Sequence, residues 1–133
     1  MPGTLIVAAI LLVLIVFVSF RRRAASLGIG NAQALRAVME DADQEYTLID
    51  VRTPSEYRDG HIPTAVNIPH DKIPGKMPRA AKDSLVVLYC HSGSRASVAR
   101  SALTAQGYTR VANFGRVGKW EGPLVEGGKP GSL

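Results

Sequence analysis

The hydrophobic positions of the chain fall into two unlike parts. Residues 4–20 form an uninterrupted run without a charge, whereas apolar and polar residues alternate in short blocks from residue 24 onward. A helix over the first run is about 25 Å long, slightly less than the hydrocarbon core of a bilayer, which is roughly 30 Å thick. We therefore expect residues 1–23 to form an N-terminal transmembrane anchor with a basic juxtamembrane cluster, and residues 24–133 to form the folded domain.

A cleaved signal peptide and a buried core helix are the alternatives for the first run. Signal peptides carry positive charge before the apolar segment, but Arg21, Arg22 and Arg23 follow it in this chain. A core helix usually has a polar face, and this run has none. Positive residues beside a membrane span stay in the cytoplasm. The anchor interpretation therefore predicts a single-pass membrane protein whose domain is cytoplasmic.

Short apolar runs alternate with helical segments in the rest of the chain. The runs typical of strands are 46–51, 65–68, 85–89 and 111–114. Three segments are typical of helices: one that follows a cap at Asn31 and runs to about Met39, one over Pro54–Arg58, and one over Ser94–Gln106. The run Leu85–Tyr89 is apolar throughout, which favours a central strand buried on both faces. This alternation predicts an α/β fold, with a mainly parallel sheet of about five strands flanked by helices.

Charge and cysteine content exclude several classes of function. The formal net charge is +5, but the three arginines after the apolar run supply most of it, and 13 basic against 11 acidic residues remain elsewhere. These charges alternate in sign and form no basic stripe, so we expect no nucleic-acid partner. With one cysteine, the chain can form neither an internal disulfide nor a cysteine-rich zinc site. We expect no metal and no cofactor.

The candidate chemistry lies in the loop after the strand Leu85–Tyr89. Cys90 falls where this strand ends, and ligands bind outside the carboxyl ends of strands in open α/β sheets. Gly93 allows loop N–H groups to turn toward one point, and the following helix directs its positive N-terminus there. Arg95 adds a cation. These features favour a thiolate on Cys90 and an anionic substrate, so we interpret Cys90 as a nucleophile rather than a buried hydrophobic residue.

Three groups of motifs carry a family resemblance. Segment 50–69 contains Asp-Val-Arg, Glu-Tyr and Gly-His-Ile-Pro, segment 87–95 contains the cysteine loop, and segment 115–130 contains a glycine, Trp120 and Gly-Lys-Pro. In this order they resemble the signatures of the rhodanese-like single-domain sulfurtransferases, over roughly residues 31–130. Arg116 departs from the resemblance, because the family usually has a second glycine at this position.

The resemblance implies a reaction in which Cys90 takes up a sulfane sulfur as a persulfide and passes it to a thiol or cyanide acceptor. It also implies that the loop binds the donor, a small molecule or a protein, through His91, Ser92, Gly93, Ser94 and Arg95. Asp50 and Arg52 are expected to support the loop as a structural pair. Because the chain has no second cysteine, the acceptor must come from outside it.

Two other classes of function stay open. A cysteine phosphatase also closes a cysteine loop with an arginine, but its signature is one residue longer than the four residues between Cys90 and Arg95. Tyr89 also stands where that signature has histidine. A non-enzymatic, membrane-tethered binding module could use the same surface, although it needs neither Cys90 nor Gly93. The sequence therefore favours the sulfurtransferase.

Overall fold

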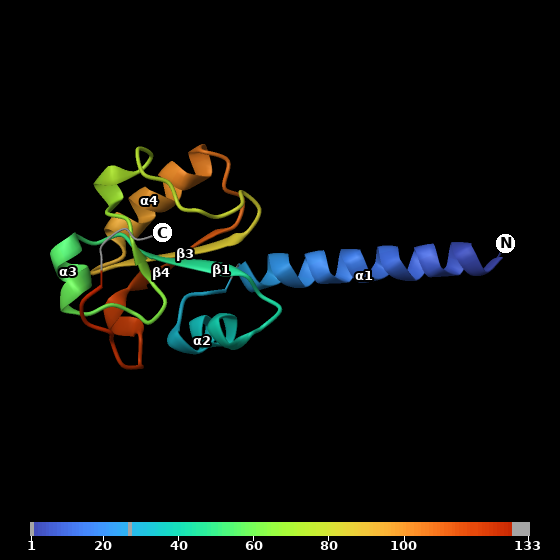
Figure 1. Ribbon diagram of the computed structural model, residues 1–133, viewed down its shortest axis with the longest axis horizontal. Helices are drawn as coiled ribbons and strands as arrows, with labels where there is room; N and C mark the ends of the chain where they lie inside the picture. The colour runs from blue at the N-terminus through green and yellow to red at the C-terminus, as the bar shows by residue number, and fades with distance from the viewer. Residues whose placement is uncertain (1, 27, 129–133) are drawn as a thin grey trace.

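The computed structural model describes the backbone of residues 2–26 and 28–128 (Figure 1). Within these ranges it describes the side chains of all residues except 18–26. The helices are α1 (Pro2–Ser26), α2 (Ala32–Glu40), α3 (Pro54–Asp59) and α4 (Ser94–Ala105), with short 3-10 helices η1 (His70–Lys72) and η2 (Val117–Lys119). The strands are β1 (Tyr46–Asp50), β2 (Val66–Asn67), β3 (Leu85–Cys90) and β4 (Val111–Arg116).

The strands form one parallel sheet in the order β2-β1-β3-β4. All six residues of β3 are buried, which confirms the predicted central strand. The expectation of about five strands is wrong for the described residues, since their sheet has four. The sequence holds only four apolar runs of this type. The later extended segment at Val125 makes an isolated antiparallel bridge with His61 and does not join the sheet.

Helices cover both faces of the sheet, as Figure 1 shows for α2 and α4. One core cluster joins Leu35 and Val38 of α2 to Val87 of β3, and the other joins Ala99 and Leu103 of α4 to the opposite face of β3. Successive strand side chains point to opposite faces of a sheet. Cys90 belongs to the second cluster, so it lies on the face that α4 covers.

Local side-chain contacts explain where the helices begin and end. The Asn31 side chain accepts a hydrogen bond from the Ala34 N–H at 2.9 Å, which confirms it as the N-cap of α2. Thr53 and Glu56 form a capping box at the start of α3, and Gly60 ends that helix as expected. The segment 65–68 is extended over only two residues, Val66–Asn67.

α1 is helical and projects away from the sheet (Figure 1). Its large apolar side chains between Leu5 and Phe17 are 51–74% exposed. Within the described residues, no helix combines the length and the apolar character that crossing a bilayer requires. The predicted transmembrane anchor at residues 4–20 is therefore not supported, although the segment forms a helix.

Candidate active site

Cys90 is the last residue of β3, and its side chain is completely buried beneath the loop that follows. The backbone N–H of Gly93 donates to Sγ of Cys90 at 2.8 Å. Gly93 has φ +96°, a left-handed conformation that favours glycine. A Cβ atom at this position would lie 3.4 Å from Cα of Gly115, which shows that the loop is in van der Waals contact with β4. The turn at Gly93 thus folds the loop back over the sulfur.

The remainder of the predicted loop faces solvent at the start of α4. His91, Ser92 and Ser94 are exposed, and the hydroxyl oxygens of the two serines are 2.9 Å apart. α4 begins at Ser94 with Gly93 as its N-cap, so no N-cap side chain binds its first N–H groups, and only the Ser92 hydroxyl accepts from the Ser94 N–H, at 3.5 Å, among the hydrogen bonds of the described residues. The partial positive charge of this helix end therefore lies in the same loop as the Gly93–Sγ contact.

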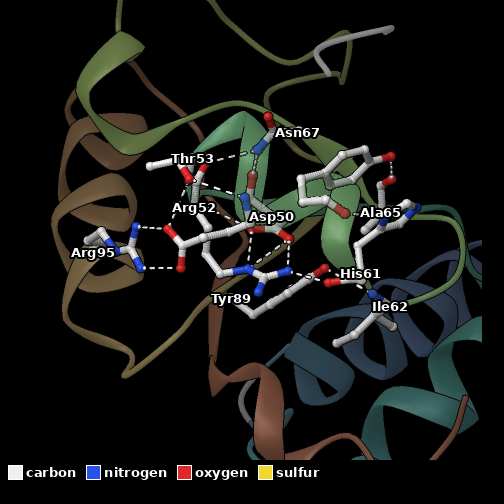
Figure 2. Close-up of polar contacts among 12 residues, drawn as sticks. Asp50, Arg52, Thr53, His61, Ile62, Ala65, Asn67, Tyr89 and Arg95 are labelled. Carbon is white, nitrogen blue, oxygen red and sulfur yellow. Dashed lines mark hydrogen bonds and ion pairs between the residues drawn. The ribbon is translucent and has the colours of Figure 1, made fainter. Parts of the chain in front are cut away.

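Arg95 is bound to a carboxylate that the sequence analysis did not identify as part of the site. Its Nη1 donates to Oε1 of Glu56 at 2.7 Å, and its Nη2 donates to Oε2 at 3.1 Å (Figure 2). Hydrogen bonding from Arg95 lowers the pKa of Glu56 to about 2, and the same hydrogen bonds raise the pKa of Arg95. This bidentate pair ties α4 to α3. The only sequence signal for it is the Thr53–Glu56 spacing of a capping box.

Asp50 and Arg52 form a buried ion pair at the end of β1 (Figure 2). The carboxylate accepts from the Arg52 backbone N–H at 2.9 Å and from its Nη2 at 2.7 Å, and Nη2 also donates to the Gly60 carbonyl at 2.6 Å. Burial opposes the guanidinium charge, but the hydrogen bonds and charge of Asp50 outweigh burial and raise the pKa of Arg52. The pair links β1 to the turn after α3, the geometry of a structural support.

Tyr89 precedes Cys90 but points to the opposite face of the sheet. Its hydroxyl oxygen accepts a hydrogen bond from the Ile62 N–H at 3.0 Å, and its side chain is completely buried. Burial, followed by the negative charge of Asp50, raises the pKa of Tyr89 far above its usual value. Tyr89 is therefore a neutral core residue rather than a proton donor at the sulfur.

Asn113 of β4 is a second residue that the sequence analysis missed. Its Nδ2 donates to the Gly93 carbonyl at 3.2 Å, and its Oδ1 accepts from the Gly115 N–H at 2.8 Å. These bonds fasten the cysteine loop to the irregularity in the β3–β4 pairing, which falls between Leu88 and Tyr89. The only signal in the sequence was a polar amide within the apolar run 111–114.

Residues 31–116 match the family model of the rhodanese-like domain. The chain is 42% identical over 84 residues to a sulfurtransferase of Allochromatium vinosum. The aligned region covers 63% of this chain and 78% of the relative. The chain is 35% identical over 81 residues to the thiosulfate sulfurtransferase PspE of Escherichia coli, covering 59% and 78%.

Solved structures show the same architecture. A structure described as a rhodanese with anions from E. coli is 33% identical, with a TM-score of 0.55 over 62% of this chain and 100% of that one. A rhodanese-like domain protein from Staphylococcus aureus is 28% identical, with a TM-score of 0.64 over 74% of this chain and 96% of that one.

Proposed function

The chain belongs to the rhodanese-like domain family, and from this premise we propose that it is a sulfurtransferase that carries a sulfane sulfur on Cys90. The observation that carries the proposal is the Gly93 N–H directed at Sγ of Cys90, at the carboxyl end of the central strand. Relatives named sulfurtransferase and thiosulfate sulfurtransferase support the reaction class.

The proposed reaction has two displacement steps on sulfur. In the first, the Cys90 thiolate attacks the outer sulfur of a donor such as thiosulfate. A bond forms between Sγ and that sulfur, the S–S bond of the donor breaks, and sulfite leaves with the electron pair. In the second, cyanide or an external thiolate attacks the outer sulfur of the persulfide. The Sγ–S bond then breaks, which restores the Cys90 thiolate and releases thiocyanate or a hydropersulfide anion.

The loop supplies electrostatic stabilisation for both steps. Negative charge lies on Sγ before the first displacement and on the outer sulfur after it, next to the Gly93 N–H and the N-terminus of α4. Thiolates in such positions are the reactive form of cysteine. Because both Nη atoms of Arg95 bind Glu56, we propose that Arg95 chiefly holds the loop. Its binding to the donor stays a prediction, as do donor contacts by His91, Ser92 and Ser94.

An intact-mass measurement tests the proposal. Reduced protein incubated with thiosulfate should gain one sulfur atom, and cyanide should remove that atom. Cys90→Ser should gain none while it keeps the wild-type melting temperature, because the substitution is nearly isosteric. A reduced wild-type protein that gains no sulfur from any of several sulfane donors would instead support the non-enzymatic binding module.

A cytoplasmic location of residues 24–133 is a separate proposal, and it depends on the sequence alone. It follows from Arg21, Arg22 and Arg23 after the apolar run, because positive residues beside a span stay on the cytoplasmic side. It also presupposes that the run inserts into a membrane. The donor and the thiol acceptor would then be cytoplasmic small molecules or proteins.

A further inference from the structure

Arg116 ends β4 directly beside the cysteine. In the pairing of β3 with β4, the Cα partner of Cys90 is Arg116. Both residues are the last of their strands, and the carboxyl ends of parallel strands form the edge at which ligands bind. The sequence places these residues 26 positions apart, so only the strand register brings them together.

The register also places Arg116 on the same face of the sheet as Cys90. Val86 pairs with Val111, and both belong to the core cluster that contains Cys90. Val87 pairs with Ala112, and both belong to the cluster on the other face. Paired residues of these strands therefore share a face. After the irregularity, the pairing resumes with Tyr89 and Gly115 and continues with Cys90 and Arg116. Val117, the next residue, packs against the cluster on the other face, so Arg116 lies on the face of Cys90.

The charge of Arg116 is not neutralised by any residue in the described part of the chain. Its side chain is exposed and takes part in neither of the ion pairs there. The carboxylates of Asp50 and Glu56 are paired with Arg52 and Arg95 instead. A positive charge without an ion-pair partner therefore stands at the edge of the sheet where β3 ends at Cys90.

Lys119 adds a second positive charge close to Gly115. A Cβ atom on Gly115 would lie 3.2 Å from its Nζ, which also donates to the Gly30 carbonyl at 3.3 Å. Gly115 in turn packs against Gly93 of the cysteine loop. The ammonium group keeps its charge and is held near the loop, but Arg116 is the cation that the strand register places next to Cys90.

We propose that Arg116 is a specificity-determining residue that makes the site select dianionic sulfur donors over monoanionic ones. This inference rests on the proposed sulfurtransferase function and names its class of donor. Arg116 attracts the doubly charged donor and stabilises the sulfite that leaves as the S–S bond breaks. Because the guanidinium is exposed, its attraction is moderate and is screened by salt.

Two donors that differ by one charge provide the test. Thiosulfate is a dianion and methanethiosulfonate is a monoanion, and each gives the same Cys90 persulfide, with sulfite or methanesulfinate as the leaving group. In Arg116→Gln we expect KM for thiosulfate to rise about fivefold and KM for methanethiosulfonate to rise about twofold or less. Arg116→Lys should restore most of the preference, because it restores the charge.

Arg100→Gln is the matched control, since Arg100 is an exposed arginine on α4 outside the described site. It should leave both KM values unchanged. Added salt should reduce the preference of the wild-type protein for thiosulfate over methanethiosulfonate. The preference of Arg116→Gln should stay nearly constant, because that variant lacks the charge that salt screens. Equal KM changes for the two donors, or an Arg116→Gln variant with wild-type kinetics, would overturn the role of Arg116. A wild-type protein that forms no persulfide would overturn the proposed function itself, so the two failures are distinguishable.

Discussion

At the scale of a single residue, Glu56 both caps the start of α3 and forms an ion pair with Arg95. Its carboxylate accepts from the Thr53 N–H and hydroxyl at the start of α3, and it receives both Nη groups of Arg95 from α4. The first contact is local in sequence, whereas the second spans 39 positions. The cysteine loop ends at Arg95, and the ion pair with Glu56 therefore fixes the end of this loop to α3.

The Glu56–Arg95 pair predicts how stability depends on pH. The folded-state pKa of Glu56 is about 2, below the ordinary value of 4.5. The stabilisation is therefore fully present above pH 4.5 and is lost as the pH falls toward 2. The pair is partly exposed, at 27% and 34% of the two side chains, so we expect it to contribute about 1 kcal/mol.

Glu56→Gln keeps the capping geometry and removes the charge. Urea denaturation should show that wild type exceeds this variant by about 1 kcal/mol in free energy of unfolding at pH 7. The difference should shrink between pH 4.5 and pH 2. A difference that stays constant over this range would contradict the assigned ion pair.

Asn113 supports the loop from the opposite side, through the Gly93 carbonyl and the Gly115 N–H. Asn113→Ala should lower kcat for sulfur transfer about tenfold with little change in KM, because the Gly93 N–H is no longer fixed on Sγ. Loss of the two hydrogen bonds should also reduce stability by about 1–2 kcal/mol. Steady-state kinetics and thermal unfolding measure the two effects. An unchanged kcat together with a lower melting temperature would contradict this role in positioning the loop and would show that Asn113 contributes only to stability.

At the scale of elements, the length of the β3–α4 loop limits the chemistry. Four residues separate Cys90 and Arg95, and the Gly93 turn brings a backbone N–H within 2.8 Å of Sγ. A tetrahedral phosphoryl group needs a wider ring of donors than one sulfur atom does. We therefore expect negligible hydrolysis of aryl phosphates by the wild-type protein.

Inserting one residue between Gly93 and Arg95 tests this limit. The longer loop should transfer sulfur more slowly, because the Gly93 N–H and the helix N-terminus no longer converge on Sγ. An assay with an aryl phosphate and one with thiosulfate, run on both proteins, measure the change. Rapid phosphate hydrolysis by the unaltered chain would overturn the assignment of the loop to sulfur chemistry.

At the scale of the whole molecule, the candidate active site and the apolar N-terminal helix α1 lie in separate parts of the fold. The two core clusters contain no residue of α1 among the described side chains, and the apolar side chains of that helix are exposed. The site lies at the carboxyl edge of the sheet, where β3 and β4 end. Burial within the domain therefore does not account for the apolar character of α1.

Protease protection tests the proposed orientation of the full-length chain. If residues 24–133 are cytoplasmic, protease added to intact cells should leave the domain uncut, and protease added after lysis should cleave it. Recovery of the chain in the membrane pellet after an alkaline wash is the accompanying measurement. Cleavage of the domain from outside intact cells would contradict the orientation, and release of the whole chain by the wash would contradict insertion.

The amino-acid sequence by itself determined the features that depend on neighbouring residues. The apolar run before Cys90, the glycine that turns the loop, and the cap at Asn31 are local, because strand burial, backbone freedom and helix capping act over a few positions. These were sufficient to place Cys90 at a strand end before a helix. The family resemblance added the reaction class.

Only the tertiary structure decided which distant residues meet. Glu56 binds Arg95 because the fold brings α3 to the start of α4, and Arg116 stands beside Cys90 because of the β3–β4 register. The sheet has four described strands rather than about five, and these four correspond to the four apolar runs of the sequence. Strand order, register and ion pairing between helices depend on how the whole core packs, which no local pattern encodes.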